Sequence, residues 1–189
     1  MKELEERILR DGKGIGTEIL KVDSFLNHQL DVGLVRRMGE EFARLFAGSG
    51  ANKILTVEAS GLPIAFAAAA AMGDLPMVFA KKKKPSTMQE EQYVGVVHSF
   101  TKNTDSSIVV SKKYLGPEDK LLIIDDFLAT GSAGMGLIDI ARQAGAEVVG
   151  YGAAIEKEFQ GGAEKLRAMG IEVHSLAVIK SIRDDNIQF

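Results

Sequence analysis

Residues 121–133 read Leu-Leu-Ile-Ile-Asp-Asp-Phe-Leu-Ala-Thr-Gly-Ser-Ala. Four large apolar residues in a row are typical of a strand that is buried on both faces of a parallel sheet. The Thr-Gly-Ser turn that follows is typical of the start of a helix, and ligands of open parallel sheets bind where the strands end. We therefore expect a strand over 120–124, a helix over 132–143 and a binding site between them.

The residue types in this loop indicate what the site binds. Backbone amides at a helix N-terminus hold phosphate groups, which is the role expected of Ala129, Thr130, Gly131, Ser132 and Ala133. Asp125 and Asp126 would repel a phosphate, so they are better suited to accept hydrogen bonds from sugar hydroxyls or to help hold a hydrated Mg²⁺. Together these groups describe a phosphorylated pentose. The alternative is that the two acids only end a strand and cap a helix.

The rest of the chain continues the alternation of apolar strands and helices. Strands are expected over 53–57, 76–80, 148–155 and 173–179, and helices over 2–10, 31–46, 163–169 and in the Ala-rich stretch after Gly61. This pattern predicts an α/β fold, a parallel sheet of about five strands with helices on both faces.

Two segments do not follow the alternation. The interval 81–115 contains two alternating stretches, 93–101 and 107–113, around the polar turn 102–106, which predicts a protruding antiparallel hairpin. Residues 1–30, with a glycine-rich loop at 12–16, are expected to form a hood over the core. We expect one domain over 1–189, with these two segments as additions that form a lid or an interface.

Composition excludes several classes of protein. A formal net charge of -3 argues against a general nucleic-acid-binding surface, and no nucleic acid is expected as a partner. The absence of cysteine excludes disulfides, thiolate metal sites and a cysteine nucleophile, and three scattered histidines predict no metal site made by the protein alone. The N-terminus lacks the apolar core of a signal peptide, and the longest apolar run, 62–72, is too short to span a bilayer. A cytoplasmic protein without membrane contact is expected.

With its apolar run, two acids and Thr-Gly turn, the stretch 121–133 resembles the signature of the phosphoribosyltransferase family with a type I, parallel-sheet fold. Three segments are similar in particular to the bacterial branch that uses xanthine: 21–29 (Lys-Val-Asp-Ser-Phe-Leu-Asn-His-Gln), 123–129 and 155–160 (Ile-Glu-Lys-Glu-Phe-Gln). The resemblance implies transfer of phosphoribose from 5-phosphoribosyl 1-diphosphate to xanthine in purine salvage, which gives xanthosine 5'-monophosphate and diphosphate. It also implies Mg²⁺ bound with the donor and a homodimer.

The resemblance assigns further roles to single residues. Asp125 and Asp126 are implied to be catalytic, Ser60 and Gly61 to hold the departing diphosphate, and a lysine of the run 81–84 to neutralise it. The sequence does not say which lysine does so, and we select Lys81. Leu20, Asn27 and Lys157 are implied to contact the purine base. The plainer explanations are an ordinary turn at 58–61, a solvated basic face at 81–84 and a packed loop with a capping Asn27.

Three other functions remain open. A guanine or hypoxanthine phosphoribosyltransferase would share every feature except the base pocket, and so would a relative that acts on adenine or on a pyrimidine. A regulator of the same fold would sense the phosphoribosyl donor without turning it over. Such a regulator needs an added DNA-binding domain, for which the N-terminal segment is too short and the chain too acidic.

Overall fold

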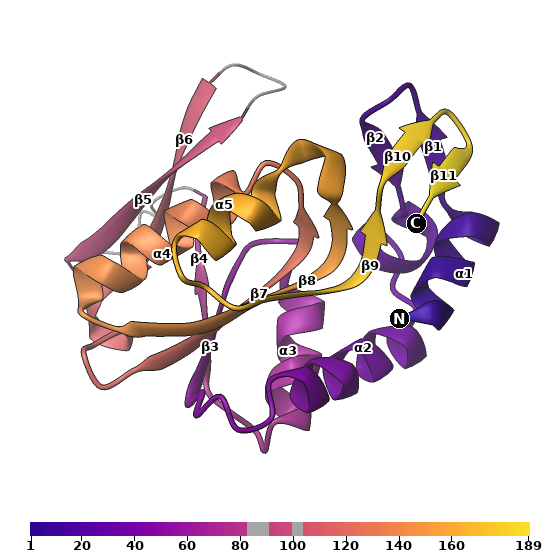
Figure 1. Cartoon of the computed structure of the whole chain (residues 1–189). Coiled ribbons are helices and arrows are strands. Elements are labelled where there is room, and N and C mark those ends of the chain that lie inside the picture. The colour runs from indigo at the N-terminus through magenta and orange to yellow at the C-terminus, as the bar shows by residue number, and fades with distance from the viewer. Residues whose placement is uncertain (83–90, 100–103) are drawn as a thin grey trace.

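A computed structural model describes residues 1–82, 91–99 and 104–189 of the chain. Its centre is a five-stranded parallel sheet in the order β4-β3-β7-β8-β9 (Figure 1). The strands are β3 (Lys53–Val57), β4 (Met77–Ala80), β7 (Lys120–Leu128), β8 (Glu147–Lys157) and β9 (Val173–Ile179). The predicted α/β sheet is confirmed. Among the residues described, no helix is both long and apolar enough to cross a bilayer.

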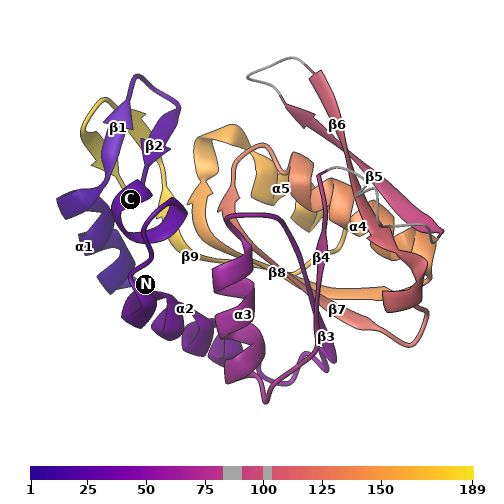
Figure 2. The same ribbon diagram turned by 180° about the vertical axis from the view of Figure 1, so that it is seen from behind.

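Helices cover both faces of this sheet (Figure 2). α2 (Val32–Leu45) and α3 (Leu62–Ala71) lie on one face, and α4 (Ser132–Ala144) and α5 (Gly162–Ala168) lie on the other. Apolar side chains therefore form two buried clusters, one on each side of the sheet. The β7 residues between them alternate, so that Leu122 and Ile124 join one cluster while Leu121 and Ile123 join the other. This two-sided burial explains the unbroken apolar run of β7.

The interval after β4 forms the predicted hairpin. β5 (Gln92–Ser99) pairs antiparallel with β6 (Thr104–Ser111). β6 begins before the predicted second strand, because backbone pairing in a protruding ribbon does not require apolar side chains. The Gln143 side chain of α4 holds the hairpin by donating to Val94 O at 2.7 Å and accepting from Val94 N at 3.3 Å. A short 3₁₀ turn, η2 (Lys112–Tyr114), leads from the hairpin towards β7.

The hood is built from both ends of the chain. It consists of α1 (Lys2–Asp11), β1 (Lys13–Ile15), β2 (Ile19–Lys21), the π-helical turn η1 (Asp23–Asn27), β10 (Ser181–Arg183) and β11 (Asn186–Gln188). The prediction of a loop over 12–16 was wrong, since Lys13–Ile15 pairs with Ile19–Lys21. The C-terminal hairpin β10–β11 was not predicted. It is joined to the N-terminal hairpin by Asp184, which accepts Gly16 N–H at 2.9 Å and donates to Gly16 O at 2.8 Å.

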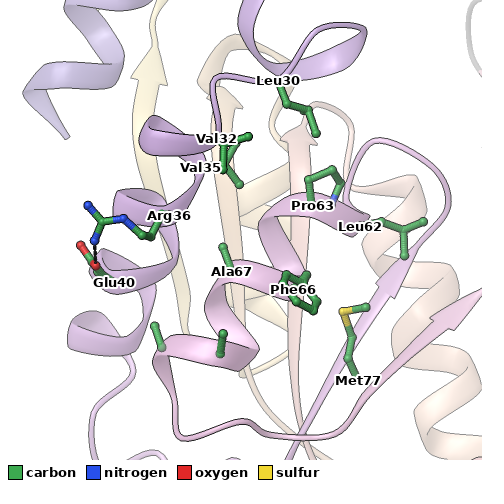
Figure 3. A pocket seen from close by; sticks show the side chains of 12 residues that line it. Leu30, Val32, Val35, Arg36, Glu40, Leu62, Pro63, Phe66, Ala67 and Met77 are labelled. Atoms are coloured by element: carbon green, nitrogen blue, oxygen red, sulfur yellow. Dashed lines mark hydrogen bonds and ion pairs between the residues drawn. The ribbon is translucent and has the colours of Figure 1, made fainter.

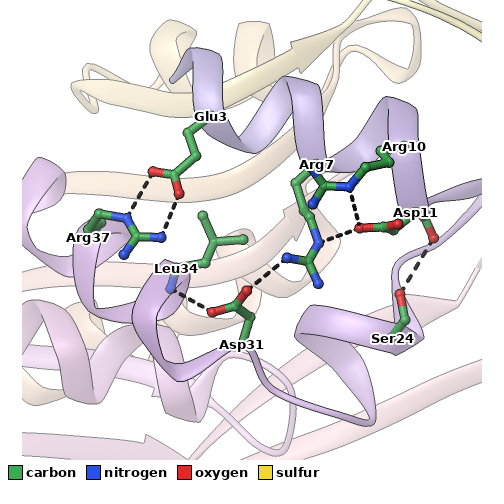
Figure 4. A network of polar contacts seen from close by, with 8 residues as sticks. All are labelled: Glu3, Arg7, Arg10, Asp11, Ser24, Asp31, Leu34 and Arg37. Atoms are coloured by element: carbon green, nitrogen blue, oxygen red, sulfur yellow. Dashed lines mark hydrogen bonds and ion pairs between the residues drawn. The ribbon is translucent and has the colours of Figure 1, made fainter.

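Buried apolar contacts and ion pairs attach α1 to the rest of the chain, and Figure 4 shows the polar contacts. Leu4 and Ile8 are fully buried on one face of the helix. On its polar side Arg7 bonds Asp31 at 2.8 Å, and Glu3 accepts Arg37 Nε at 2.9 Å. Asp31 caps α2, since its carboxylate accepts Leu34 N–H at 3.0 Å. That backbone donor, helped by Arg7, lowers the pKa of Asp31.

Candidate active site

The carboxyl ends of β7 and β8 lie between the hairpin and the hood, as both views show (Figures 1 and 2). Asp125 and Asp126 lie within β7, whereas the sequence predicted that the strand would end at residue 124. The strand continues because its backbone stays paired with β8, with Asp125 opposite Ala153 and Leu128 opposite Glu156. The two acids are thus held by a sheet ladder and not by a flexible loop.

Asp125 is the more enclosed of the two acids, with 3% exposure against 9% for Asp126. Its Oδ1 accepts the backbone N–H of Asp126 at 2.9 Å, and its Oδ2 accepts the hydroxyl of Tyr151 at 3.0 Å. Burial raises the pKa of Asp125 well above its ordinary value, and the neighbouring carboxylate of Asp126 raises it further. Buried carboxyl groups with displaced pKa values are typical of functional sites.

The loop after β7 encloses a small cavity of about 90 Å³, lined by residues 127–134 and Tyr151. Gly131, with φ +82°, is the residue before α4, so the loop turns directly into the helix start. The start of α5 braces the loop from outside, since Gly162 N–H donates to Ala129 O at 3.0 Å. A Cβ on Gly162 would lie 2.3 Å from Ala129 O and 2.6 Å from Gly131 N, so only glycine permits this approach. The five residues predicted to hold a phosphate therefore share one braced loop at a helix N-terminus.

The loop that follows β3 lies beside the acid pair. Ser60 and Gly61 precede α3, and a Cβ on Gly61 would lie only 3.4 Å from Asp125 Oδ1. The sheet therefore brings the loop predicted to hold diphosphate next to the acids predicted to hold the sugar.

Lys81 follows the carboxyl end of β4, at the same edge of the sheet as the acid pair. Its backbone N–H and C=O both pair with Val109 of β6 at 2.9 Å, so the base of the hairpin fixes its position. Its ammonium lies 5.7 Å from the ring centre of Phe79. Glu58, at the start of the loop after β3, accepts Lys82 N–H at 2.8 Å and links the two loops. The other two lysines of the run, at 83–84, lie outside the described residues.

The residues predicted to contact the base lie at the hood. Lys157, at the end of β8, donates to Glu18 O at 2.6 Å, and its ammonium lies 5.4 Å from the ring centre of Phe127. Partial burial lowers the pKa of Lys157, and the Glu18 carboxylate opposes this effect. Asn27 is exposed at the end of η1, whereas Leu20 is 6% exposed and packs in the hood core. Leu20 thus has little surface left for contact with a ligand.

The donor set at the acid pair fits a Mg²⁺ ion that arrives with its ligand. Mg²⁺ usually keeps several waters and binds through one or two carboxylates plus substrate phosphates. Within the described part of the chain, no group of three or more His, Cys, Asp or Glu side chains could hold an ion without help. Asp125 and Asp126 provide two carboxylates at the place where a phosphorylated ligand would bring its own oxygens.

Two residues of the site were missed by the sequence argument. Tyr151 lies in the middle of an apolar strand, where its hydroxyl carried no local signal. Gly162 lies in the pair Gly161-Gly162 before α5, and a double glycine ahead of a helix could have indicated a close backbone contact. The remaining predicted residues lie at one edge of the sheet or in the hood that covers it.

Comparison with known proteins agrees with this geometry. A family model described as phosphoribosyl transferase domain matches residues 21–172. A curated protein of Moorella thermoacetica named xanthine phosphoribosyltransferase is 55% identical over 98% of this chain and 94% of its own length. Proteins of the same name from Brevibacillus brevis and Streptococcus pyogenes are 50% and 52% identical over 100% of this chain, and 96% and 97% of their own lengths are covered.

Solved structures support the fold alone, because their sequences are distant. An adenine phosphoribosyltransferase from Rhodothermus marinus matches with a TM-score of 0.75 at 20% identity, over 94% of this chain and 99% of that chain. An adenine phosphoribosyltransferase from Trypanosoma brucei matches with a TM-score of 0.77 at 14% identity, over 93% of this chain and 79% of that chain.

The contact between Gly162 and the loop after β7 generates a prediction. Gly162→Ala would push the new methyl group against Ala129 O, and overpacking of this kind costs about 1–3 kcal/mol. We expect weaker binding of ribose 5-phosphate by about 10-fold, measured by calorimetry, because each ~1.4 kcal/mol changes affinity tenfold. Gly33→Ala is the matched control, since a Cβ there meets the flexible end of Arg37 at 3.3 Å and Asp31 Oδ1 at an ordinary contact distance of 3.5 Å. Equal affinities for the two variants would show that the brace does not shape the loop.

Proposed function

The chain belongs to the phosphoribosyltransferase family, and on that premise we propose that it transfers phosphoribose from 5-phosphoribosyl 1-diphosphate to xanthine. The products are xanthosine 5'-monophosphate and diphosphate, in purine salvage. The enzyme is thus a glycosyltransferase. Support comes from relatives named xanthine phosphoribosyltransferase at 50–55% identity over nearly the whole chain.

One observation carries the proposal, namely the order of chemical groups around the edge of the sheet. The braced loop 129–133 follows the two acids and leads into α4 on one face of the sheet, whereas the Ser60–Gly61 loop lies next to Asp125 and leads into α3 on the other face. The donor has the same order, with a 5-phosphate, a ribose and a 1-diphosphate. In this proposal the loop after β7 binds the phosphate, the acids bind the ribose hydroxyls, and Ser60, Gly61 and Lys81 bind the diphosphate.

The reaction exchanges one bond at the anomeric carbon. A purine nitrogen forms a bond to C1 of the ribose, the C1–O bond to diphosphate breaks, and the electron pair leaves with the diphosphate. Positive charge builds on the sugar and negative charge on the leaving group in the transition state. The protein contributes by holding the reactants in line and by placing fixed charges where these charges develop. Mg²⁺ bound to the donor would supply further neutralisation of the diphosphate.

Lys157 is the residue that we propose for selection of the base. Xanthine has two carbonyl oxygens and can lose a proton near neutral pH, so a cationic partner favours it over adenine. Lys157 lies over the ring of Phe127, which is partly buried, and Asn27 offers an amide that can donate and accept. In this proposal Lys157 exchanges Glu18 O for an oxygen of the base.

The decisive assay offers the protein several bases together with the donor and Mg²⁺. Nucleotide formation from xanthine, guanine, hypoxanthine, adenine and uracil would be followed by chromatography. We expect xanthosine 5'-monophosphate to form fastest. A preference for guanine or hypoxanthine would support a phosphoribosyltransferase but contradict xanthine as its base. Binding of the donor without turnover would indicate a regulator.

Replacement of Lys157 tests the base pocket. Hydrogen bonds to charged groups contribute about 1.5–3 kcal/mol, so Lys157→Met should raise the KM for xanthine roughly 10- to 150-fold. Because the pKa of Lys157 is lowered, the ammonium is lost as pH rises through that lowered value, and xanthine affinity should fall on the alkaline side. Lys157→Arg should restore part of the affinity, and the exposed Lys113→Met should change nothing. An unchanged KM in Lys157→Met would remove this residue from the pocket.

We further propose a homodimer formed through an apolar groove between α2 and α3 (Figure 3). The groove has a volume of about 790 Å³ and exposes Phe66 at 68% and Val32 at 74%. Large exposed apolar patches usually bind another protein. The ion pair of Arg36 and Glu40 lies at its border, so a copy related by two-fold symmetry could offer each charge its opposite. Leu62 lines the groove and follows Gly61, which places such an interface beside the proposed diphosphate loop.

A charge in this groove should separate the subunits. We expect Phe66→Asp to sediment at half the mass of the unmodified protein, because a carboxylate would have to be buried in the interface. Leu9→Asp is the matched control, as Leu9 is 58% exposed on α1, outside the groove. A Phe66→Asp protein that remains dimeric would exclude this surface as the interface.

We also propose that the chain 1–189 works as one domain in the cytoplasm. The lack of cysteine is compatible with a reducing compartment, and the substrates assigned above are small metabolites. Separation of the hood from the sheet would be costly, because residues of α1 and of both terminal hairpins share one buried cluster with α2 and α3.

A further inference from the structure

One buried side chain of β3 has a polar group without a partner. In the stretch Ile-Leu-Thr-Val at 54–57, only Thr56 carries a hydroxyl, and its side chain is 0% exposed. Of the residues that the structure describes, none forms a hydrogen bond with its Oγ1. Such a group lowers stability, and nearly all buried polar groups of native proteins are hydrogen-bonded. The function proposed above gives this hydroxyl no role.

The strand itself does not require a hydroxyl at this position. Ile54, two residues earlier and therefore on the same face of β3, belongs to the apolar cluster that this face shares with α2 and α3. Valine has nearly the shape of threonine and is also favoured in strands, so both packing and strand preference would be satisfied without Oγ1. The hydroxyl therefore needs an explanation outside the strand.

The loop 58–61, whose last two residues are proposed to hold diphosphate, lies directly over this hydroxyl. A Cβ on Gly61 would lie 2.5 Å from Thr56 Oγ1, so only glycine lets the backbone pass this close. The same Cβ would lie 3.4 Å from Asp125 Oδ1. Gly61 therefore borders both the unpaired hydroxyl and one of the acids proposed to bind ribose.

The backbone of this loop has polar groups that are not yet used. Gly61 O accepts Ala65 N–H at 2.9 Å, which ties the loop to α3. In contrast, no described residue accepts a hydrogen bond from the N–H groups of residues 59–61. Amides just ahead of a helix are suited to bind an anion. Because the loop covers Thr56 completely, a partner for the hydroxyl has to come from the loop and not from the ligand.

We propose that Thr56 is a positioning residue for the loop 58–61. When diphosphate binds, the loop shifts, and its backbone forms a hydrogen bond with the Thr56 hydroxyl, which does not touch the ligand. This bond exists only in the diphosphate complex, so it favours the shifted loop and raises the affinity for diphosphate. Because Gly61 also borders Asp125, the same bond fixes the spacing between diphosphate and ribose. The inference rests on the proposed function, from which it takes the assignment of diphosphate to this loop.

Two variants that differ by one hydroxyl test this role. Thr56→Ser keeps the hydroxyl, and Thr56→Ala removes it without adding volume. We expect Thr56→Ala to bind inorganic diphosphate with Mg²⁺ roughly 5- to 150-fold more weakly in calorimetry, because a loop group then stays unpaired in the complex. Thr56→Ser should keep most of the affinity. Thr17→Ala is the matched control, since Thr17 is exposed in a turn of the hood.

Ribose 5-phosphate separates a local effect from a general one. We expect both Thr56 variants to bind it as the unmodified protein does, because the loop after β7 is untouched. Equal affinities of Thr56→Ala and Thr56→Ser for diphosphate would overturn the proposal. So would a loss of affinity for ribose 5-phosphate in Thr56→Ala as large as the loss for diphosphate, because that result indicates a structural role.

Thermal unfolding provides a measurement without ligand. Thr56→Ala lacks the unpaired hydroxyl that Thr56→Ser retains, so we expect it to melt about 2–4 °C higher although it binds diphosphate more weakly. A lower melting temperature for Thr56→Ala would show that the hydroxyl already has a partner, and would refute the proposal.

The proposed function can fail separately. An unmodified protein that binds diphosphate but forms no nucleotide from any base would refute the proposed function and leave the role of Thr56 in place. An unmodified protein that does not bind diphosphate would refute the role of Thr56 as well.

Discussion

A carboxylate buried beneath the start of a helix is tolerated only if its oxygens receive hydrogen bonds, and Asp125 meets this condition with donors from two strands. Its position depends on β7 and β8 remaining paired to their carboxyl ends, which holds Tyr151 within reach. Gly61 lacks a side chain where the loop after β3 approaches this carboxylate, and Gly134 lacks one where α4 packs on the ring of Tyr151. The geometry of the whole site therefore follows from the packing around one buried acid.

Under the proposed function, the hood places the residues that bind the base above the sheet. Its parts come from opposite ends of the chain and are joined through Asp184 and the backbone of Gly16. Lys157 reaches it from β8 through the carbonyl oxygen of Glu18. Lys157 is partly buried and donates to this backbone oxygen, and under the proposed function an oxygen of the base replaces that acceptor. The proposed function therefore assigns selection of the base to the place where the sheet and the hood meet.

Local sequence was a good guide wherever burial alone decided the structure. β3 and β9 occupy the predicted residues 53–57 and 173–179, since each is an apolar run covered on both faces. Local sequence was a poor guide where hydrogen bonds between neighbouring strands decided the structure. β1 forms in a glycine-rich stretch and β7 continues through two acids, because a strand is defined by hydrogen bonds to its neighbour and not by its own hydrophobicity.

The sequence by itself determined the fold class, the succession of strands and helices along the chain and the loop that joins two acids to a helix start, because each is encoded in contiguous residues. Only the tertiary structure decided that Tyr151 meets Asp125 across 26 residues, that Gly162 braces Ala129, and that the two chain ends form one hood. These contacts join strands and loops that are distant in sequence, and their distances depend on strand order and close packing. No local pattern of residues predicts these contacts.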